Sequence, residues 1–132
     1  MQVFRYPGFH VSLPQGWRKA GLLRRLLFMG NPELYGPGGR SIKFAIGPIS
    51  PAPSAEQQRN NLEAIAVRHG HHVIETDIIE VGGRDHATMV CRVPGVGVLK
   101  NYSLIFGETE YFVTAQGDVN ELDSIIRTFR VA

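Results

Sequence analysis

The sequence predicts one domain of the α+β class, in which helices lie against a single antiparallel β-sheet. Three observations support this prediction. The 132 residues are 43% hydrophobic and 20% charged, which is typical of one globular domain covering residues 1–132. Short segments that alternate apolar and polar residues follow one another closely, and consecutive strands of this kind pair antiparallel. Two other segments place apolar residues at helical spacing, so the expected order is at least two strands, a helix, four strands and a helix.

The first part of the chain is expected to be rich in turns, because seven of the eight prolines lie at or before Pro53. Residues 9–13 alternate apolar and polar side chains, which predicts a half-buried strand. A Pro-Gln-Gly turn follows this strand, and Trp17 is expected to anchor the turn in the core. Residues 41–46 predict a second strand for the same reason as the first.

Residues 54–70 predict the first helix. Ser54 is expected to cap its first turn, and Gln57 three residues later completes a capping box. Gly70 is well placed to end the helix, because glycine readily adopts the left-handed conformation found at helix ends. The face expected to be buried carries four residues at helical spacing, namely Leu62, Ile65, Ala66 and His69.

Four strands are expected to follow the first helix as two hairpins. Residues 73–81 and 84–93 flank Gly82-Gly83, a strong signal for a two-residue hairpin turn. Residues 98–106 and 111–116 form the second pair around a four-residue turn. Because these strands are short, consecutive and alternating, the sheet is expected to be antiparallel.

The last helix has the cleanest pattern in the chain. Asp118 is expected to cap it, and Glu121 to complete the capping box. Its apolar residues recur at i, i+3, i+4 and i+7, namely Leu122, Ile125, Ile126 and Phe129. A stripe of this kind is expected to pack on the sheet.

Short signatures lie near the start, in the middle and at the end of the chain, namely Gly8-Phe9-x-Val11-x-x-Pro14-x-Gly16-Trp17, Val81-Gly82-Gly83-Arg84-x-x-Ala87 and Ile125-Ile126-x-x-Phe129. Together they resemble the PsbP-like fold family, which includes the PsbP subunit of photosystem II, a Ran-binding nucleotide-release factor and small bacterial proteins of unknown function. The resemblance implies an antiparallel sheet sandwiched by helices. It implies no reaction, because members of the family mostly bind other proteins or support a larger assembly, and a shared fold says little about shared function.

Three histidines within four residues, His69, His71 and His72, form the one candidate metal site in the sequence. Imidazole nitrogens are common ligands of zinc and other divalent metals. However, the chain has no HExxH motif, and consecutive strand residues point to opposite faces of a sheet. A solvated group of polar residues at a helix end is therefore the main expectation, and a metal site built from the three histidines is the alternative.

No other set of residues predicts catalysis, so no catalytic residue and no cofactor is assigned. Cys91 and His86 occupy positions of one predicted strand whose side chains point to opposite faces of the sheet, so they cannot form a cysteine–histidine pair within it. Cys91 is expected to be a buried thiol. The chain lacks a GxSxG motif and a complete phosphate-binding loop. The carboxylate pairs, Glu75 with Asp77 and Glu108 with Glu110, are expected to be solvated.

Charge is distributed unevenly along the chain. Residues 1–50 carry seven basic side chains and one acidic side chain, whereas residues 51–132 carry seven basic and eleven acidic ones. Such a basic region could face an acidic partner, so Arg18, Lys19, Arg24 and Arg25 are candidate partner contacts. The segment Leu22–Met29 surrounds two of these arginines with apolar residues. It is either core or, if exposed, a surface for a partner protein or a second copy of the chain.

The sequence therefore predicts a small non-catalytic binding or accessory protein that acts through protein–protein contacts, with a homodimer as one form of partner. The alternative is a metal-binding protein or metal-dependent enzyme that uses the histidine group. A nucleic-acid partner is not expected, because the net charge is only +2 and no aromatic residues alternate with the arginines. No apolar run is long enough to span a membrane. The cytoplasm is the expected location, or export if a leader preceded this sequence.

Overall fold

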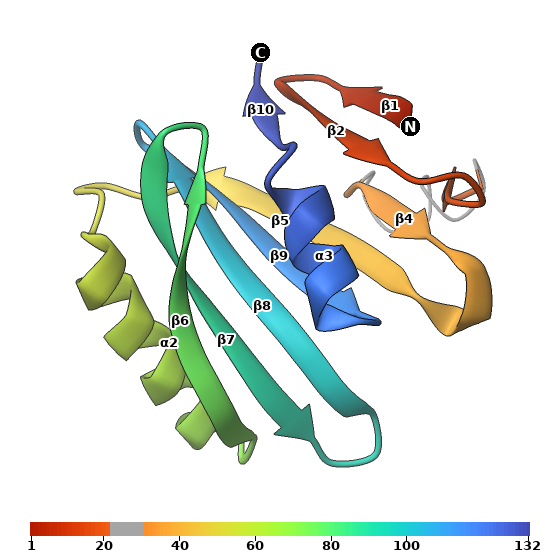
Figure 1. Ribbon diagram of the computed structural model, residues 1–132. Coiled ribbons are helices and arrows are strands. Elements are labelled where there is room, and N and C mark those ends of the chain that lie inside the picture. Colours follow the sequence, from red (N-terminus) through yellow and green to blue (C-terminus); the bar gives the residue numbers. More distant parts are fainter. Residues whose placement is uncertain (22–30) are drawn as a thin grey trace.

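The computed structural model describes residues 1–21 and 31–132 of the chain (Figure 1). In chain order the elements are β1 (Gln2–Tyr6), β2 (Phe9–Leu13), β3 (Arg18–Lys19), β4 (Glu33–Tyr35), the 3-10 turn η1 (Pro37–Gly39), β5 (Ser41–Pro48), α2 (Ala55–Arg68), β6 (His72–Val81), β7 (Arg84–Val93), β8 (Gly97–Phe106), β9 (Thr109–Gln116), α3 (Val119–Ile126) and β10 (Arg130–Val131). The described residues thus form a mainly β structure with two α-helices, which confirms the predicted α+β class.

The strands form two antiparallel sheets, so the prediction of a single sheet is wrong. The larger sheet has seven strands in the order β3-β4-β5-β9-β8-β7-β6, and the smaller one has three in the order β1-β2-β10. The reason is the pairing of β2, the strand predicted at residues 9–13, which pairs with β1 on one side and β10 on the other. Period-two alternation indicates a strand with one buried face, but it does not say which strands are its neighbours.

The two helices lie on opposite faces of the seven-stranded sheet, and α3 shares its face with the smaller sheet (Figure 1). We call the face under α2 the α2 face and the opposite one the α3 face. Helix α2 packs mainly on β6 and β7, and its Gln58 side chain reaches Ser103 of β8 and Glu110 of β9. Within residues 1–21 and 31–132, helices therefore cover the part of the α2 face formed by β5, β8 and β9 only in part.

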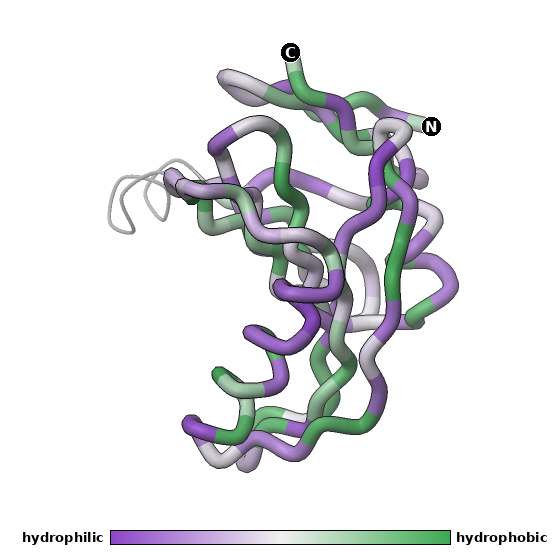
Figure 2. The backbone as a smooth tube through the Cα atoms, turned by 90° about the vertical axis from the view of Figure 1, so that its left-hand side faces the viewer, coloured by the Kyte–Doolittle hydropathy of each residue, from purple (hydrophilic) through white to green (hydrophobic). Residues whose placement is uncertain are grey.

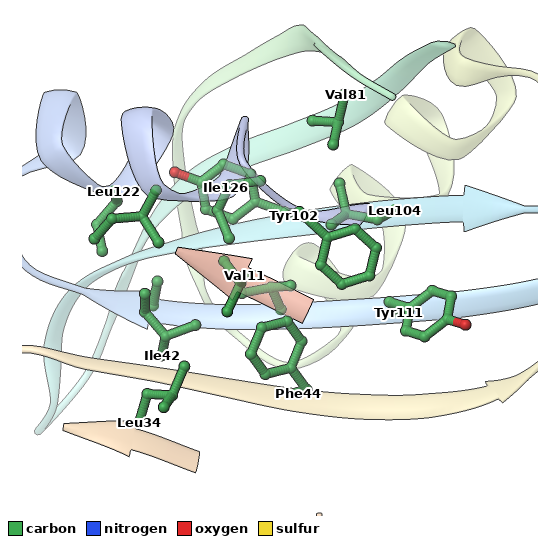
Figure 3. Packing of buried hydrophobic residues seen from close by; sticks show 14 of the residues in the cluster. Val11, Leu34, Ile42, Phe44, Val81, Tyr102, Leu104, Tyr111, Leu122 and Ile126 are labelled. Carbon is green, nitrogen blue, oxygen red and sulfur yellow. The ribbon is translucent and has the colours of Figure 1, made fainter. Parts of the chain in front are cut away.

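The main hydrophobic core lies on the α3 face. Figure 3 shows Leu122 and Ile126 of α3 packed over Tyr102 of β8, with Val11 of β2 and Phe44 of β5 beside them. The predicted helical stripe is confirmed, because Leu122, Ile125, Ile126 and Phe129 are all buried, although Phe129 follows the last helical residue. Burial of each large apolar side chain contributes about 1.5–3 kcal/mol to folding.

A smaller core lies on the α2 face, where Leu62 and Ala66 of α2 pack on Ala87, Met89 and Cys91 of β7. The buried stripe of α2 is narrower than predicted. Ile65 is 41% exposed and His69 is exposed, whereas the polar Gln58 is buried. Residues 58, 62 and 66 share one line along the helix because they are four positions apart.

The predicted helix caps and the first hairpin turn are largely confirmed. Ser54 and Gln57 form the complete capping box of α2, and the Asp118 side chain accepts a hydrogen bond from the Glu121 backbone at the start of α3. Both glycines of the Gly82-Gly83 turn have positive φ, at 61° and 76°, as a type I′ hairpin turn requires. The expected second half of the α3 box is absent, because the Glu121 side chain turns instead to Arg40.

Candidate functional site

The predicted basic contact residues are described only in part. Arg18 is exposed on β3, whereas Lys19 donates a hydrogen bond from Nζ to the carbonyl oxygen of Arg5 at 2.9 Å. The same ammonium lies 4.4 Å from the ring centroid of Tyr6, so Lys19 binds strand β1 of its own chain. Arg24, Arg25 and the segment Leu22–Met29 lie outside the described residues. The basic contact surface therefore stays a prediction, with Arg18 as its exposed described member.

The structure brings two of the three histidines together. His69 lies at the end of α2 and His71 just before β6, and their ring centroids are 5.9 Å apart with the ring planes at 65°. His72 is the first residue of β6. Within residues 1–21 and 31–132, no group of three or more His, Cys, Asp or Glu side chains is arranged to hold a metal ion. The described geometry thus supplies a pair of imidazoles and no complete ligand set.

His86 and Cys91 lie on opposite faces of β7, as predicted. The His86 imidazole is buried on the α3 face, where Nδ1 accepts a hydrogen bond from the Ile105 backbone at 3.0 Å and Nε2 donates to the Val81 carbonyl at 3.1 Å. Burial lowers the pKa of His86, with the nearby Arg84 acting in the same direction. Burial raises the pKa of the Cys91 thiol. Both groups are therefore held neutral, and neither activates the other.

A polar network on the α3 face joins α3 to β8. Asp123 accepts hydrogen bonds from the Lys100 ammonium at 2.8 Å and from the Tyr102 hydroxyl at 2.5 Å. Burial and the neighbouring Asp123 carboxylate together raise the pKa of Tyr102. The three groups satisfy one another, so this network fastens α3 to the sheet.

A second polar network on the α2 face was not expected from the sequence. The Glu110 carboxylate is half-buried and accepts hydrogen bonds from Ser103 Oγ at 2.6 Å and from Gln58 Nε2 at 2.7 Å. The prediction that Glu110 is fully solvated is therefore wrong. One signal in the sequence could have predicted this network. Gln58 lies four residues before Leu62, which places it on the buried side of α2.

Strand β6 forms the long edge of the seven-stranded sheet. It has ten residues, whereas β3 at the opposite edge has two, and no other strand of the described part of the chain pairs with the outer side of β6. Its pairing with β7 shifts register between Val73 and Glu75, and Ile74 at this bulge is 47% exposed. Glu75, Asp77 and Glu80 are exposed on the same strand. This edge offers unpaired backbone groups beside an apolar side chain and three carboxylates.

Helix α2 is fixed alongside β6 by hydrogen bonds. Arg59 Nε donates to Thr76 Oγ1 at 2.8 Å, and the Thr76 hydroxyl donates to Glu63 Oε1 at 3.3 Å. One turn beyond Glu63, Val67 is 71% exposed. The long edge of the sheet is thus bordered by a helix that carries an exposed apolar side chain of its own.

None of the helices in the described part of the chain has the length and apolar character needed to cross a bilayer.

Comparison with known proteins identifies the fold. No family model and no curated protein matches the sequence. Among solved structures, the chain is similar to the solution structure of cyanobacterial PsbP (CyanoP) from Synechocystis sp. PCC 6803, with a TM-score of 0.65 and 11% sequence identity. The similarity covers 99% of this chain and 92% of that chain. A likeness at this identity establishes the fold, so the PsbP-like fold expected from the three short signatures is confirmed.

Proposed function

We propose that this chain, with its PsbP-like fold, is a non-catalytic binding or accessory protein that acts through protein–protein contacts, and that the outer edge of β6 is its docking surface. The observation that carries the proposal is the long unpaired edge of β6 with Ile74 exposed at its bulge. An extended segment of a partner can add to such an edge as a further strand. Backbone hydrogen bonds then supply affinity, and alternate side chains supply specificity.

The charges on β6 define the partner's chemistry. Glu75 pairs with Val90 and Asp77 pairs with Thr88 in the β6–β7 register, so the two carboxylates lie on one face of the sheet. The strand carries no lysine or arginine. A partner strand with basic side chains two residues apart would place its charges beside both carboxylates, and opposite charges across neighbouring strands stabilise the pairing.

The same charges argue against β6 pairing with β6 of a second copy. Such a pair would bring two sets of three carboxylates to one seam with no basic side chain from either strand. A partner of different sequence is therefore favoured over a homodimer at this edge.

Peptide selection tests the proposal. Peptides selected from a random library on the wild-type protein are expected to alternate apolar and basic residues. The double variant Glu75→Lys/Asp77→Lys is expected to bind the selected peptides at least tenfold more weakly. The control Glu56→Lys/Glu108→Lys makes the same change in net charge at exposed positions outside β6 and is expected to keep full affinity. Equal loss in both variants, or no loss in either, contradicts the proposal.

Metal binding by the histidine group is the second candidate function. The observation in its favour is the pair of rings of His69 and His71, 5.9 Å apart, with His72 adjacent in sequence. Zinc titration followed by calorimetry tests it, with His69→Ala/His71→Ala as the variant and His10→Ala as the control. Stoichiometric binding that the double variant alone removes would support a metal-binding protein, and equal binding by all three proteins would contradict it.

A further inference from the structure

A cavity of about 190 Å³ lies between α2 and the α2 face of the sheet. Leu62 and Ala66 of α2 form one wall, and Met89 and Cys91 of β7 form the wall opposite. The last turns of α2, which border this cavity, are more hydrophobic than its first turns (Figure 2). The closed part of the cavity is therefore apolar on both sides.

The cavity opens sideways because α2 is offset from the middle of the sheet. The helix packs mainly on β6 and β7, so it covers only part of the side chains that β8 and β9 present on the same face. Leu99 of β8 and Phe112 of β9 line the open side and are each half-buried, and Ile65 of α2 lies at its rim. A small molecule can thus enter beside the helix without separating it from the sheet.

Two polar side chains stand together at the open side. Asn101 and Thr114 are partners in the β8–β9 register and both line the cavity. Asn101 Nδ2 lies 3.9 Å from Cys91 Sγ, a long and weak contact, and the Thr114 hydroxyl has no hydrogen-bond partner among the described residues. This pair can therefore both donate hydrogen bonds to a ligand and accept them from it.

We propose that this cavity binds a small aromatic molecule that carries one polar group. An apolar cavity of about 150 Å³ binds benzene, so the somewhat larger volume here suits one ring with a fused or attached group. The ring lies between α2 and β7, and its polar atom bonds with Asn101 and Thr114. Binding sites of this kind combine apolar walls with a few convergent polar groups. The site is separate from the outer edge of β6, so either proposal can fail without the other.

Indole serves as the probe, because its bicyclic ring carries one N–H donor. In protein labelled with ¹³C at the methionine methyl groups, indole is expected to shift the Met89 resonance in a saturable manner. The variant Leu99→Trp fills the open side and is expected to weaken indole binding at least tenfold. Val98→Trp places the same side chain at the preceding position of β8, on the opposite face, and is expected to leave binding unchanged.

The polar pair is tested by comparing indole with toluene, which has no polar group. Thr114→Val keeps the shape of the side chain and is expected to weaken indole binding several-fold while toluene binding is unchanged. The absence of saturable Met89 shifts in the wild-type protein would overturn the proposal. An equal loss of toluene binding in Thr114→Val would overturn the assigned role of the polar pair.

Discussion

His86 holds a neutral imidazole in the core because both of its ring nitrogens bind backbone groups. Its Nδ1 accepts from the Ile105 N–H, so Nδ1 cannot carry a proton while this bond exists. The ring also packs on Phe106, with centroids 4.8 Å apart. A single side chain of β7 thus links the last residue of β6 to β8 through backbone hydrogen bonds.

This arrangement predicts a pH dependence of stability. Because burial lowers the pKa of folded His86 below its usual value of 6.5, the unfolded chain binds more protons than the folded one as the pH falls. The contribution of His86 is therefore fully present above about pH 6.5 and is lost as the pH falls from there toward the lowered pKa. The variant His86→Gln is expected to lose less unfolding free energy between pH 7 and pH 5 than the wild type does.

Urea unfolding at the two pH values measures this difference. At pH 7 the variant itself is expected to be less stable by about 1–3 kcal/mol, because the backbone groups of Val81 and Ile105 lose well-placed partners. His72→Gln, a change at an exposed histidine, serves as the control and is expected to behave as the wild type. An unchanged pH dependence in His86→Gln would show that His86 is not the titrating group.

At the scale of elements, α3 is held to the sheet by its apolar stripe and by one buried ion pair. Lys100 is 8% exposed, and its ammonium is paired with Asp123, which also accepts from Tyr102. A buried charge that loses its partner is strongly destabilising. The ion pair therefore fixes the position of α3 along β8, while the burial of Leu122 and Ile126 contributes to stability.

The variant Asp123→Ala is accordingly expected to lower the free energy of unfolding by about 3 kcal/mol, since it leaves the Lys100 ammonium and the Tyr102 hydroxyl without their acceptor. Chemical denaturation measures the change. Ser124→Ala, at the next and exposed position of α3, is the control and is expected to change stability by less than about 0.5 kcal/mol. A small effect of Asp123→Ala would mean that solvent already screens this pair.

Elements with strong local signals could be predicted from the sequence, and their neighbours in space could not. The capping box at Ser54, the Gly82-Gly83 hairpin and the apolar stripe of α3 depend on residues close together in the chain. By contrast, the pairing of β2 with β10 joins residues more than a hundred positions apart. The side chain of Glu121 turns to Arg40 for a similar reason, because a partner 81 positions away in the sequence leaves no local signal.

The candidate sites show the same division. The alternation of side chains along a strand correctly predicted that His86 and Cys91 lie on different faces of β7, because this alternation depends only on local sequence. The free edge of β6 and the cavity beside α2 arise only when all seven strands and the helix are assembled. They could not be inferred without the strand order.

At the scale of the whole molecule, the described residues leave one long sheet edge without a further strand and one sheet face partly uncovered. The edge is β6, and the partly covered face is that of β5, β8 and β9 beyond α2 (Figure 1). The main core and both ends of the described chain lie on the other face, where β1, β2 and β10 form the second sheet. Binding at the edge or in the cavity thus leaves the main core undisturbed.

Amide hydrogen exchange tests the central claim most directly, because it reports which backbone groups a partner protects. We expect a selected peptide to slow the exchange of amides in β6 by at least tenfold, while exchange at the edge strands β1 and β3 is unchanged. The same peptide should leave Glu75→Lys/Asp77→Lys unprotected. Protection confined to β1 or β3, or protection of β6 that persists fully in this variant, would contradict the assignment of β6 as the docking edge.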